Sequence, residues 1–365
     1  MATTPATGFL VIADLTGYTA YLSRAELEHA PTIAGDLLET VVGRLEPPFR
    51  LAKLEGDAAF LYVEDERADG ALLVDALTAA YHAFRRRLRS IEVATSCSCQ
   101  ACGLAPRLDL KLFVHHGSWV RGRIAGRDEL AGPSVILVHR LLKGTTADAA
   151  HDDAGAARGF ALLTADAVAQ LGRVRLGDGV TEAHEVIEHF GEVELLQVDL
   201  EGRWQAERDE RRIDLVGVPS PIDLEVSLPA PTAEVWAALT SPSRRAAWEG
   251  AIVVLDDPDG PRGVGSRASC VTGRLAMLEE VVDWQPFDHL AYRLAVPGIG
   301  PVEATYDLTE TTEGTSLALR MRLPPDAIVD PAAIERLRDE RQGAFGRLPG
   351  VLGRDLARPG MEGSR

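Results

Sequence analysis

A charged segment divides this sequence into two halves that follow different patterns. Residues 201–221, EGRWQAERDERRIDLVGVPSP, are aperiodic and end in prolines, so we expect a linker here. Upstream, strand-length apolar runs alternate with helical patterns, which is typical of one α/β domain. Downstream, a strand, a helix and a short helical or loop segment precede several strands and a final helix, an α+β pattern. We predict a domain over 1–202, a linker over 203–220 and a domain over 221–357.

Composition and charge limit the possible partners. The 365 residues are 46% hydrophobic, enough for a substantial core, and the net charge of −17 argues against nucleic acid or an anionic membrane surface as main partner. No apolar run is long enough to span a membrane, and MATTPATGFLV lacks the features of a signal peptide. The four cysteines do not suggest a secreted disulfide framework. We therefore expect a cytoplasmic protein.

An aspartate, Asp14, stands at the end of the first apolar run, GFLVIADLTGYTAYLS. The run predicts a strand buried on both faces, where an ionised carboxylate is costly unless it is paired, caps a helix or binds a cation. A predicted β-hairpin over 49–64 places a second carboxylate, Asp57, at its turn. If the first strand is central, the two carboxylates lie together and suit one or two Mg²⁺ or Mn²⁺ ions that bridge a polyphosphate. Capping and turn roles are the alternative.

Five segments, in order, resemble class III nucleotidyl cyclases. FLVIADLTGYT resembles their opening strand and turn, KLEGDAAF their metal-binding hairpin, and LKLFVHHGSWVRGRIAG their His-x-Gly…Gly strand pair. GPSVILVHRLL and FALLTADAVAQL resemble the next helix and a later strand–helix unit, so that the likeness covers roughly residues 8–200. The segments also resemble DUF2652, a group of bacterial proteins of unknown function built on a cyclase-like domain. The resemblance implies an α/β (α+β) ferredoxin-like cyclase-homology domain and a homodimer formed through it, because cyclase sites form between two such domains.

The resemblance implies a role for each matching residue. Asp14 and Asp57 match the two metal-binding aspartates. Lys53 matches the purine-reading position that favours adenine, and Glu129 falls where adenylyl cyclases usually have Asp. Arg140 matches the arginine that stabilises charge on the transferred phosphate. From the residues alone, Lys53 also suits a solvent-facing strand position and Arg140 a side chain extending from a helix end.

Two departures from the cyclase pattern concern catalysis. The transition-state asparagine, four residues before the arginine, is Ile136 in this chain. The late strand HFGEVELLQVDLEG lacks the lysine and glycines that normally deliver a phosphate-binding cation. Ring closure depends on electrostatic stabilisation of a pentavalent phosphorus, and an isoleucine cannot donate a hydrogen bond. The two departures favour a degenerate site.

A cysteine cluster precedes the segment LKLFVHHGSWVRGRIAG. The stretch SCSCQACG places Cys97, Cys99 and Cys102 at C-x-C-x₂-C spacing. Three thiolates so close can share one tetrahedral Zn²⁺ ion, with His115, His116 or a residue of another chain as the fourth ligand. Buried or redox-active free thiols are the alternative. The zinc hypothesis predicts about one zinc ion per chain.

The second half resembles START-like domains of the SRPBCC, or polyketide cyclase, type. IDLEVSLPAPTAEVWAALTSPSRRAAWEG matches the strand, the APxxEVW segment and the short helix ending in Trp with which such domains begin. The later strands and long final helix fit their α+β helix-grip fold, which encloses an apolar cavity for a hydrophobic small molecule. Aromatic residues are the candidate cavity walls, although aromatics also serve as plain core: Trp248, Trp284, Tyr292 and Tyr306.

Three functions fit this sequence. In the first, a bacterial cytoplasmic sensor keeps a degenerate metal–nucleotide pocket, for ATP among others, coupled to a START-like domain that binds a hydrophobic ligand. In the second, an active adenylyl cyclase converts ATP to cyclic AMP with two metal ions under control of the START-like domain. In the third, a START-like enzyme or carrier uses the first domain only to dimerise. Ile136 and the missing lysine favour the first.

Overall fold

The computed structural model describes residues 5–25, 29–94, 99–146, 159–171, 176–177, 179–209, 213–257, 262–272, 275–323 and 330–356. The chain divides into two compact units, Met1–Glu210 and Arg211–Arg365. This boundary lies inside the range 203–220 that we expected to be a linker. The first residues of that range differ from the expectation, because they belong to helix α8, Leu200–Asp209, of the first unit. Among the described helices, none has the length and hydrophobicity to cross a membrane.

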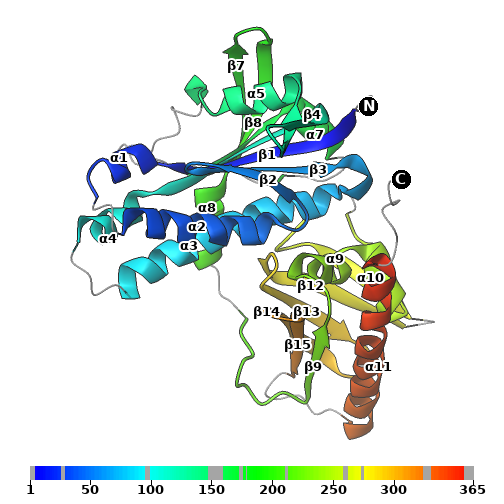
Figure 1. Ribbon diagram of the computed structural model, residues 1–365. Helices are drawn as coiled ribbons and strands as arrows, with labels where there is room; N and C mark the ends of the chain where they lie inside the picture. The colour runs from blue at the N-terminus through cyan, green and yellow to red at the C-terminus, as the bar shows by residue number, and fades with distance from the viewer. Residues whose placement is uncertain are drawn as a thin grey trace. The chain divides into compact units, whose positions relative to one another are not determined.

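The first unit is a mixed α/β structure whose helices cover a large sheet (Figure 1). Its strands are β1 Ala6–Thr16, β2 Arg50–Glu55, β3 Ala58–Glu64, β4 Asp109–Ile124, β5 Arg127–Ala131, β6 Phe160–Thr164, β7 Val180–Ile187 and β8 Gly191–Asp199. Its α-helices are α1 Tyr18–Leu22, α2 Ala30–Leu45, α3 Gly70–Ala94, α4 Gln100–Leu104, α5 Pro133–Leu141, α7 Ala165–Gln170 and α8. Two 3₁₀ turns follow β3 and α4: η1 Asp65–Arg67 and η2 Ala105–Arg107.

Strand β1 lies in the interior of this sheet. The strand order is β2-β3-β1-β4-β6-β8-β7, with β5 paired to β4. Both neighbours of β1 run antiparallel to it, whereas β4 and β6 are parallel. The side chains of β1 are buried from Gly8 through Ala13, as expected for a strand covered on both faces. Asp14 therefore stands at the end of a central strand.

The two faces of the sheet carry different helices. Helices α2 and α3 pack side by side along one face, and α5 covers the other (Figure 1). On β1, Leu10 and Ile12 belong to the same apolar core as Leu137 and Val138 of α5. Because strand side chains alternate between faces, Asp14, two residues after Ile12, points to the α5 face.

Helix α8 packs on α3 through polar contacts as well as through the buried Trp204, whose ring lies 5.4 Å from that of His82. The Tyr81 hydroxyl of α3 lies 3.0 Å from Asp109 Oδ1 and 2.6 Å from Glu201 Oε2, so one phenol proton faces two carboxylates. Burial raises the pKa of Asp109 to about 6. The next residue of α3, His82, contacts Glu207 of α8, and both side chains are buried. The last helix of the first unit thus buries several ionisable groups where it packs on α3.

The second unit is one antiparallel sheet with a long helix. Its strand order is β10-β11-β12-β13-β14-β15-β9, and every neighbouring pair is antiparallel. The strands are β9 Ile222–Leu228, β10 Ile252–Leu255, β11 Arg267–Thr272, β12 Leu275–Gln285, β13 His289–Val296, β14 Gly300–Thr311 and β15 Gly314–Arg322. The helices are α9 Thr232–Thr240, α10 Pro242–Glu249 and α11 Pro331–Leu356. This is the α+β order expected from the sequence.

Candidate functional site

One row of side chains crosses the first sheet at the end of β1. The strand registers pair Glu55 with Ala58, Ala58 with Asp14, Asp14 with Lys111, and Lys111 with Phe160. The row therefore runs from β2 through β3, β1 and β4 to β6 on the α5 face. Its charged members are two carboxylates and one ammonium group, set among apolar neighbours.

The structure brings Asp14 and Asp57 together, as we expected from the hairpin. Gly56 adopts a positive φ of 72° in the tight turn between β2 and β3, a conformation that suits glycine. The Asp57 carbonyl accepts a hydrogen bond of 3.1 Å from the Leu15 backbone N–H, which fixes the turn beside the end of β1. Burial and the nearby Asp57 charge raise the pKa of Asp14 to about 6, while Lys111 opposes the rise.

This carboxylate pair suits a hard divalent cation. Mg²⁺ and Mn²⁺ prefer carboxylate and carbonyl oxygens, and both are available from Asp14 and Asp57. A bound cation would also offset the repulsion and the burial that together raise the pKa of Asp14. The donor chemistry of these residues therefore fits the metal that the cyclase resemblance implies.

Sequence reasoning missed Lys111, which lies beside the carboxylate pair. Its side chain is only 7% exposed, and its ammonium nitrogen lies 5.4 Å from the centre of the Phe160 ring. The signal was a lysine inside the apolar strand LDLKLFV, but its meaning depends on the register that sets it opposite Asp14. A fixed positive charge therefore shares the site with any metal ion.

Lys53 and Glu129 lie in contact. The Lys53 ammonium is 3.2 Å from Glu129 Oε2 and 2.9 Å from Glu55 Oε1, and the hydrogen bond to Glu55 contributes most to a raised pKa of Lys53. Glu55 also faces His139 Nε2 of α5 at 2.9 Å, while His139 Nδ1 faces the Val135 carbonyl at 2.7 Å. Both ring nitrogens of His139 therefore face oxygen acceptors. The resemblance indicated the Lys53–Glu129 pair, but neither Glu55 nor His139.

Arg140 and Ile136 lie on the outer side of α5. Arg140 is half exposed, and its partner among the described residues is Glu188, with 3.8 Å between Arg140 Nη1 and Glu188 Oε2. The structure thus does not join Arg140 to Asp14 and Asp57. Ile136, one turn earlier, is 53% exposed. An exposed apolar side chain occupies the position at which the resemblance implies a hydrogen-bond donor.

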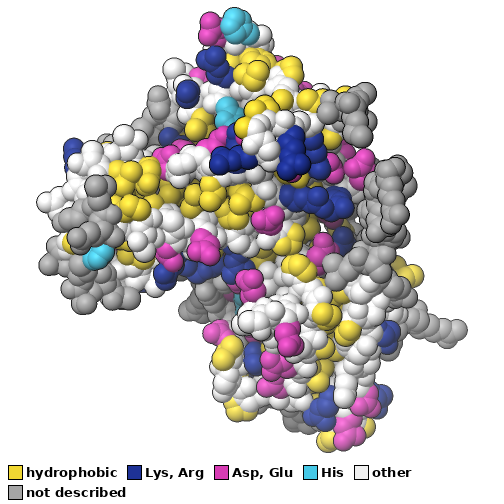
Figure 2. All heavy atoms as spheres, in the orientation of Figure 1, with side chains coloured by type: hydrophobic (Ala, Val, Ile, Leu, Met, Phe, Trp, Pro, Cys, Tyr) yellow, Lys and Arg dark blue, Asp and Glu magenta, His cyan; other side chains and the backbone are white. Residues whose placement is uncertain are grey.

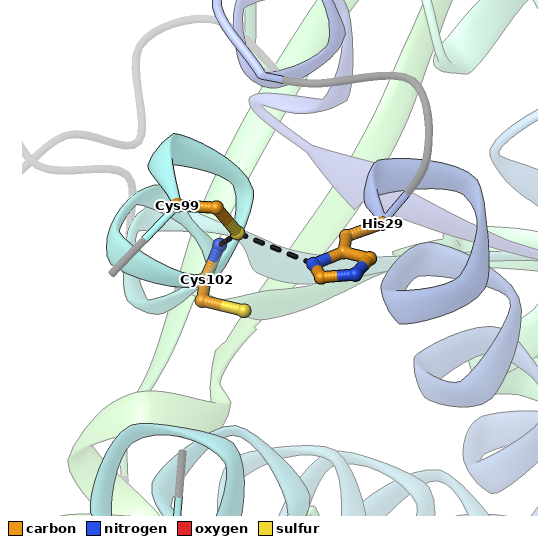
Figure 3. Close-up of side chains that lie close together, drawn as sticks. All are labelled: His29, Cys99 and Cys102. Atoms are coloured by element: carbon orange, nitrogen blue, oxygen red, sulfur yellow. Dashed lines mark hydrogen bonds between the residues drawn. The ribbon is translucent and has the colours of Figure 1, made fainter. Parts of the chain in front are cut away.

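Two of the three clustered cysteines meet a histidine from a distant part of the sequence. His29 Nδ1 lies 3.3 Å from Cys99 Sγ, and the side chains of His29, Cys99 and Cys102 converge (Figure 3). Their potential ligand atoms all lie within 4.8 Å of one another. Cys97 lies outside the described residues. No sequence pattern linked His29 to the cysteines, because 70 residues separate it from Cys99.

The two histidines that we considered as further zinc ligands have other partners. His115 Nδ1 lies 2.9 Å from the Thr164 hydroxyl, and burial lowers the pKa of His115 to about 4. His116 Nε2 lies 2.9 Å from Asp65 Oδ1. Both fit the strand-packing role better than a metal role.

The interior of the second unit holds a charged cluster. The Arg245 guanidinium donates to both carboxylate oxygens of Glu279, at 2.7 and 3.0 Å, and to Glu249 Oε1 at 2.9 Å. Cys270 Sγ lies 3.3 Å from Glu249 Oε2, and burial with the nearby carboxylates raises the pKa of Cys270 to about 12. Glu249, Cys270 and Glu279 converge closely enough to suggest a cation site. Arg245 pairs with both carboxylates and Arg341 Nη1 lies 4.0 Å from Glu249 Oε2, so the cluster is better described as a buried ion-pair network.

Three of the four aromatic residues predicted to line a cavity are connected by ring contacts. Trp248 packs on Phe345 of α11 with 6.2 Å between ring centres, Phe345 stacks on Tyr306 at 6.4 Å, and Tyr306 meets Tyr292 at 6.2 Å. All of these rings are buried. Trp284 belongs to a different cluster, where it packs at 4.9 Å against a tryptophan of α9.

Two known protein families match parts of this chain, one in each unit. Residues 34–150 match the family "Protein of unknown function (DUF2652)". Residues 222–353 match the family "Polyketide cyclase / dehydrase and lipid transport". The two matches confirm the resemblances to DUF2652 and to the polyketide cyclase type. A curated relative from Mycobacterium tuberculosis, "Uncharacterized protein Rv2561/Rv2562", is 36% identical over 107 residues, which cover 29% of this chain and 50% of that protein. The chain thus spans about half the length of this relative.

Solved structures are similar to parts of this chain. The adenylyl cyclase CyaB from P. aeruginosa is 17% identical, over 54% of this chain and 96% of that one, with a TM-score of 0.39. Protein MLL2253 from Mesorhizobium loti is 24% identical, over 36% of this chain and 96% of that one, with a TM-score of 0.31.

Proposed function

We propose that this chain is a regulatory protein with two binding modules. The first unit binds a purine nucleoside triphosphate together with a divalent cation, and the second binds a small hydrophobic molecule. The βαββαβ order with strands β2-β3-β1-β4 supports a ferredoxin-like cyclase-homology unit, and the sheet with helix α11 supports a helix-grip unit. One observation carries the nucleotide assignment. Hairpin β2–β3 holds Asp57 and Lys53, and their partners Asp14 and Glu129 lie beside it.

The residues of the first unit divide into two roles. Asp14 and Asp57 would hold the cation, which neutralises polyphosphate charge when bound. Lys53 and Glu129 offer a donor next to an acceptor, which complements the acceptor and amino donor on the edge of adenine. Lys53 has three N–H donors, of which Glu55 and Glu129 take two, so one donor is left for a base.

The outer surface of α5 supports binding without efficient turnover. Ile136 supplies no hydrogen bond to a charged transition state, and removal of one such donor typically costs a factor of about 10² to 10³ in rate. Ile136 and Leu54, 58% exposed on β2, are large apolar side chains on the surface of this unit. Such residues favour a homodimer formed through the first unit, in which each nucleotide site receives residues from two chains.

Calorimetric titration of the purified protein with ATP in the presence of Mn²⁺ tests this function. We expect binding that Asp14→Asn weakens at least tenfold, about 1.4 kcal/mol, whereas Glu192→Gln, which removes an exposed carboxylate of β8, leaves it unchanged. GTP is expected to bind more weakly than ATP, because its edge presents the opposite donor pattern to Lys53 and Glu129. Absence of ATP binding, or equal binding by Asp14→Asn, would contradict the proposal.

An active adenylyl cyclase is the second candidate, and the Lys53–Glu129 contact favours it. Cyclic AMP formed from ATP and Mn²⁺, and absent with Asp14→Ala, would establish turnover. The variant Ile136→Asn sharpens this assay, because it introduces a hydrogen-bond donor at the one position on α5 where the resemblance requires it. A cyclic AMP signal that rises in Ile136→Asn identifies this position as the block to catalysis. No signal in either protein supports the regulatory role.

The second unit calls for a separate ligand test. The ring chain from Trp248 to Tyr292 lies near Arg245 and Arg341, so we propose a hydrophobic ligand that carries a polar group. Titration with the amphipathic dye 1-anilinonaphthalene-8-sulfonate is expected to quench tryptophan fluorescence and to bring dye emission that saturates. Emission that does not saturate, or that appears only on unfolding, would contradict a defined site.

A further inference from the structure

We propose that His29, Cys99 and Cys102 bind one zinc ion, which links the start of helix α2 to the short helix α4. The three side chains come from two segments of the first unit and point toward one another (Figure 3). His29 Nδ1 and Cys99 Sγ are 3.3 Å apart, and the three potential ligand atoms lie within 4.8 Å of one another. The site is separate from Asp14 and Asp57, and from the contacts of Lys53 with Glu55 and Glu129.

The spacing of these atoms suits a tetrahedral ion. With Zn–S bonds near 2.3 Å and Zn–N bonds near 2.0 Å, tetrahedral ligand atoms lie about 3.5–3.8 Å from one another. The His29–Cys99 separation of 3.3 Å and the upper limit of 4.8 Å for the other pairs are compatible with this range, so an ion requires only small side-chain rotations. Two thiolates and a neutral imidazole cancel the charge of Zn²⁺. The fourth position is left to water or to another donor, as in many zinc sites with three protein ligands.

The local structure directs each side chain to this point. His29 occupies the N-cap position of α2, but its side chain makes no capping hydrogen bond and instead faces Cys99. Cys99 caps α4, because its sulfur accepts the Cys102 backbone N–H at 3.4 Å. A hydrogen bond of this kind orients a metal-binding thiolate from outside the coordination sphere. His29 is exposed and Cys102 is buried, so the group is open to an incoming ion from one side.

The ligand types select the metal. Sulfur and imidazole ligands in a tetrahedral set favour zinc over magnesium, calcium or manganese, which prefer oxygen. The second convergent group in the described chain, Glu249 with Cys270 and Glu279, differs because Arg245 pairs with its carboxylates. In the group around His29, the two thiols release their protons when zinc binds.

The position of the site suggests what zinc does. Helix α1 directly follows β1, which ends two residues after Asp14, and α1 contacts both α2 and α4. Helix α4 and η2 lead directly into β4, which carries Lys111. A zinc ion that joins α2 to α4 therefore stabilises the connections at the end of the sheet where the carboxylate pair lies. The ion has a structural role and takes no part in nucleotide chemistry.

Elemental analysis of the full chain, purified without chelators and with zinc in the medium, is the primary test. We expect about one zinc per chain in the unaltered protein and a loss of most of it in His29→Ala and in Cys99→Ser after dialysis against a weak chelator. Cys270→Ser, in the second unit, serves as matched control and is expected to keep its zinc. Because His29 is exposed, His29→Ala tests the site without removing a core side chain.

Cobalt substitution gives a second readout that does not depend on activity. We expect Co²⁺ to produce the visible absorption of a tetrahedral site and near-ultraviolet thiolate charge transfer, which weakens in Cys99→Ser. Zinc removal from the unaltered protein is expected to lower the melting temperature of the first unit, with no such shift for His29→Ala. No zinc and no cobalt spectrum would overturn the proposal, as would a full equivalent of zinc kept by both His29→Ala and Cys99→Ser. A Cys99–Cys102 disulfide in the purified protein would also overturn it.

Discussion

The two units bury ionisable groups in opposite ways. In the second unit, Arg245 satisfies Glu249 and Glu279 through three hydrogen bonds of 2.7 to 3.0 Å, and all three side chains are buried. In the first unit, Asp14 is held near Asp57 with Lys111 alone opposing the repulsion, and the pKa of Asp14 is raised to about 6. Charge that is matched internally holds a fold together. Charge that is left unmatched at a strand end is available to a ligand.

The largest expected loss of stability comes from removing Arg245 from its buried cluster with Glu249 and Glu279. Arg245→Met leaves Glu279 without its ion-pair partner and Glu249 with only Arg341, 4.0 Å away, so we expect it to destabilise the second unit by about 3–5 kcal/mol. Scanning calorimetry of the full chain measures this as a lower transition temperature for that unit. Arg322→Met, which removes an exposed pair with Glu303, is the control and should cost less than about 1 kcal/mol. Equal effects would mean that burial does not distinguish the two pairs.

A gain in stability is expected when the carboxylate pair of Asp14 and Asp57 is broken. Asp14→Asn removes a carboxylate whose charged form burial and Asp57 disfavour, so we expect the metal-free first unit to gain about 1–2 kcal/mol at pH 7. The same variant should lose most of its Mn²⁺ affinity. Urea unfolding with and without Mn²⁺ separates the two effects. A loss of stability in metal-free buffer would show that Asp14 serves the fold and not a ligand.

A titratable pair in the second unit sharpens the comparison. Burial disfavours the charged form of His289, but its hydrogen bond with Asp307 at 2.6 Å and the charges of Asp307, Asp283 and Asp214 outweigh burial and raise its pKa. Arg320 also reaches Asp307, at 3.1 Å.

Because the folded-state pKa of His289 lies above its unfolded value, the stabilisation is complete at low pH and is lost as pH rises through the folded pKa. We therefore expect the unfolding free energy of the second unit to fall as the pH rises above about 6.5 and through the folded-state pKa of His289. His289→Gln should flatten this slope in urea titrations. A slope unchanged in that variant would assign the dependence to other groups.

The smallest effect on stability is expected from replacing Lys53, which is partly exposed. Lys53→Ala breaks contacts with Glu55 and Glu129 that solvent largely screens, so unfolding should change by less than about 0.5 kcal/mol. Its effect should show instead in the preference for ATP over GTP. A variant with unchanged preference would remove Lys53 from the base-reading role.

Local patterns in the sequence predicted much of this structure. The apolar run before Asp14 predicted a doubly covered strand, and the turn Glu55-Gly56-Asp57 predicted the hairpin that brings Asp57 to it. Both depend on short-range signals, namely hydrophobic continuity and turn chemistry. The pattern of the second half likewise predicted an antiparallel sheet followed by one long helix.

Features that depend on long-range register could not be predicted in this way. Lys111 acquires its meaning only when β4 pairs with β1, and His29 only when the segment before α2 meets α4. Residues 203–209 were expected to be linker because they are charged and aperiodic, yet they are helical. Several of the contacts of this helix with α3 are polar, and hydrophobic periodicity gives no signal for them.

The attachment of α8 has a consequence for local opening of the molecule. Tyr81 shares one proton between Asp109 and Glu201, and the neighbouring contact is the His82–Glu207 pair. Water can replace such partners more readily than it can replace apolar packing. In native-state hydrogen exchange, the amides of α8 are therefore expected to exchange sooner than those of α3, and their rates to vary with pH beyond the intrinsic dependence. Helix α8 is then expected to open locally before helix α3 does.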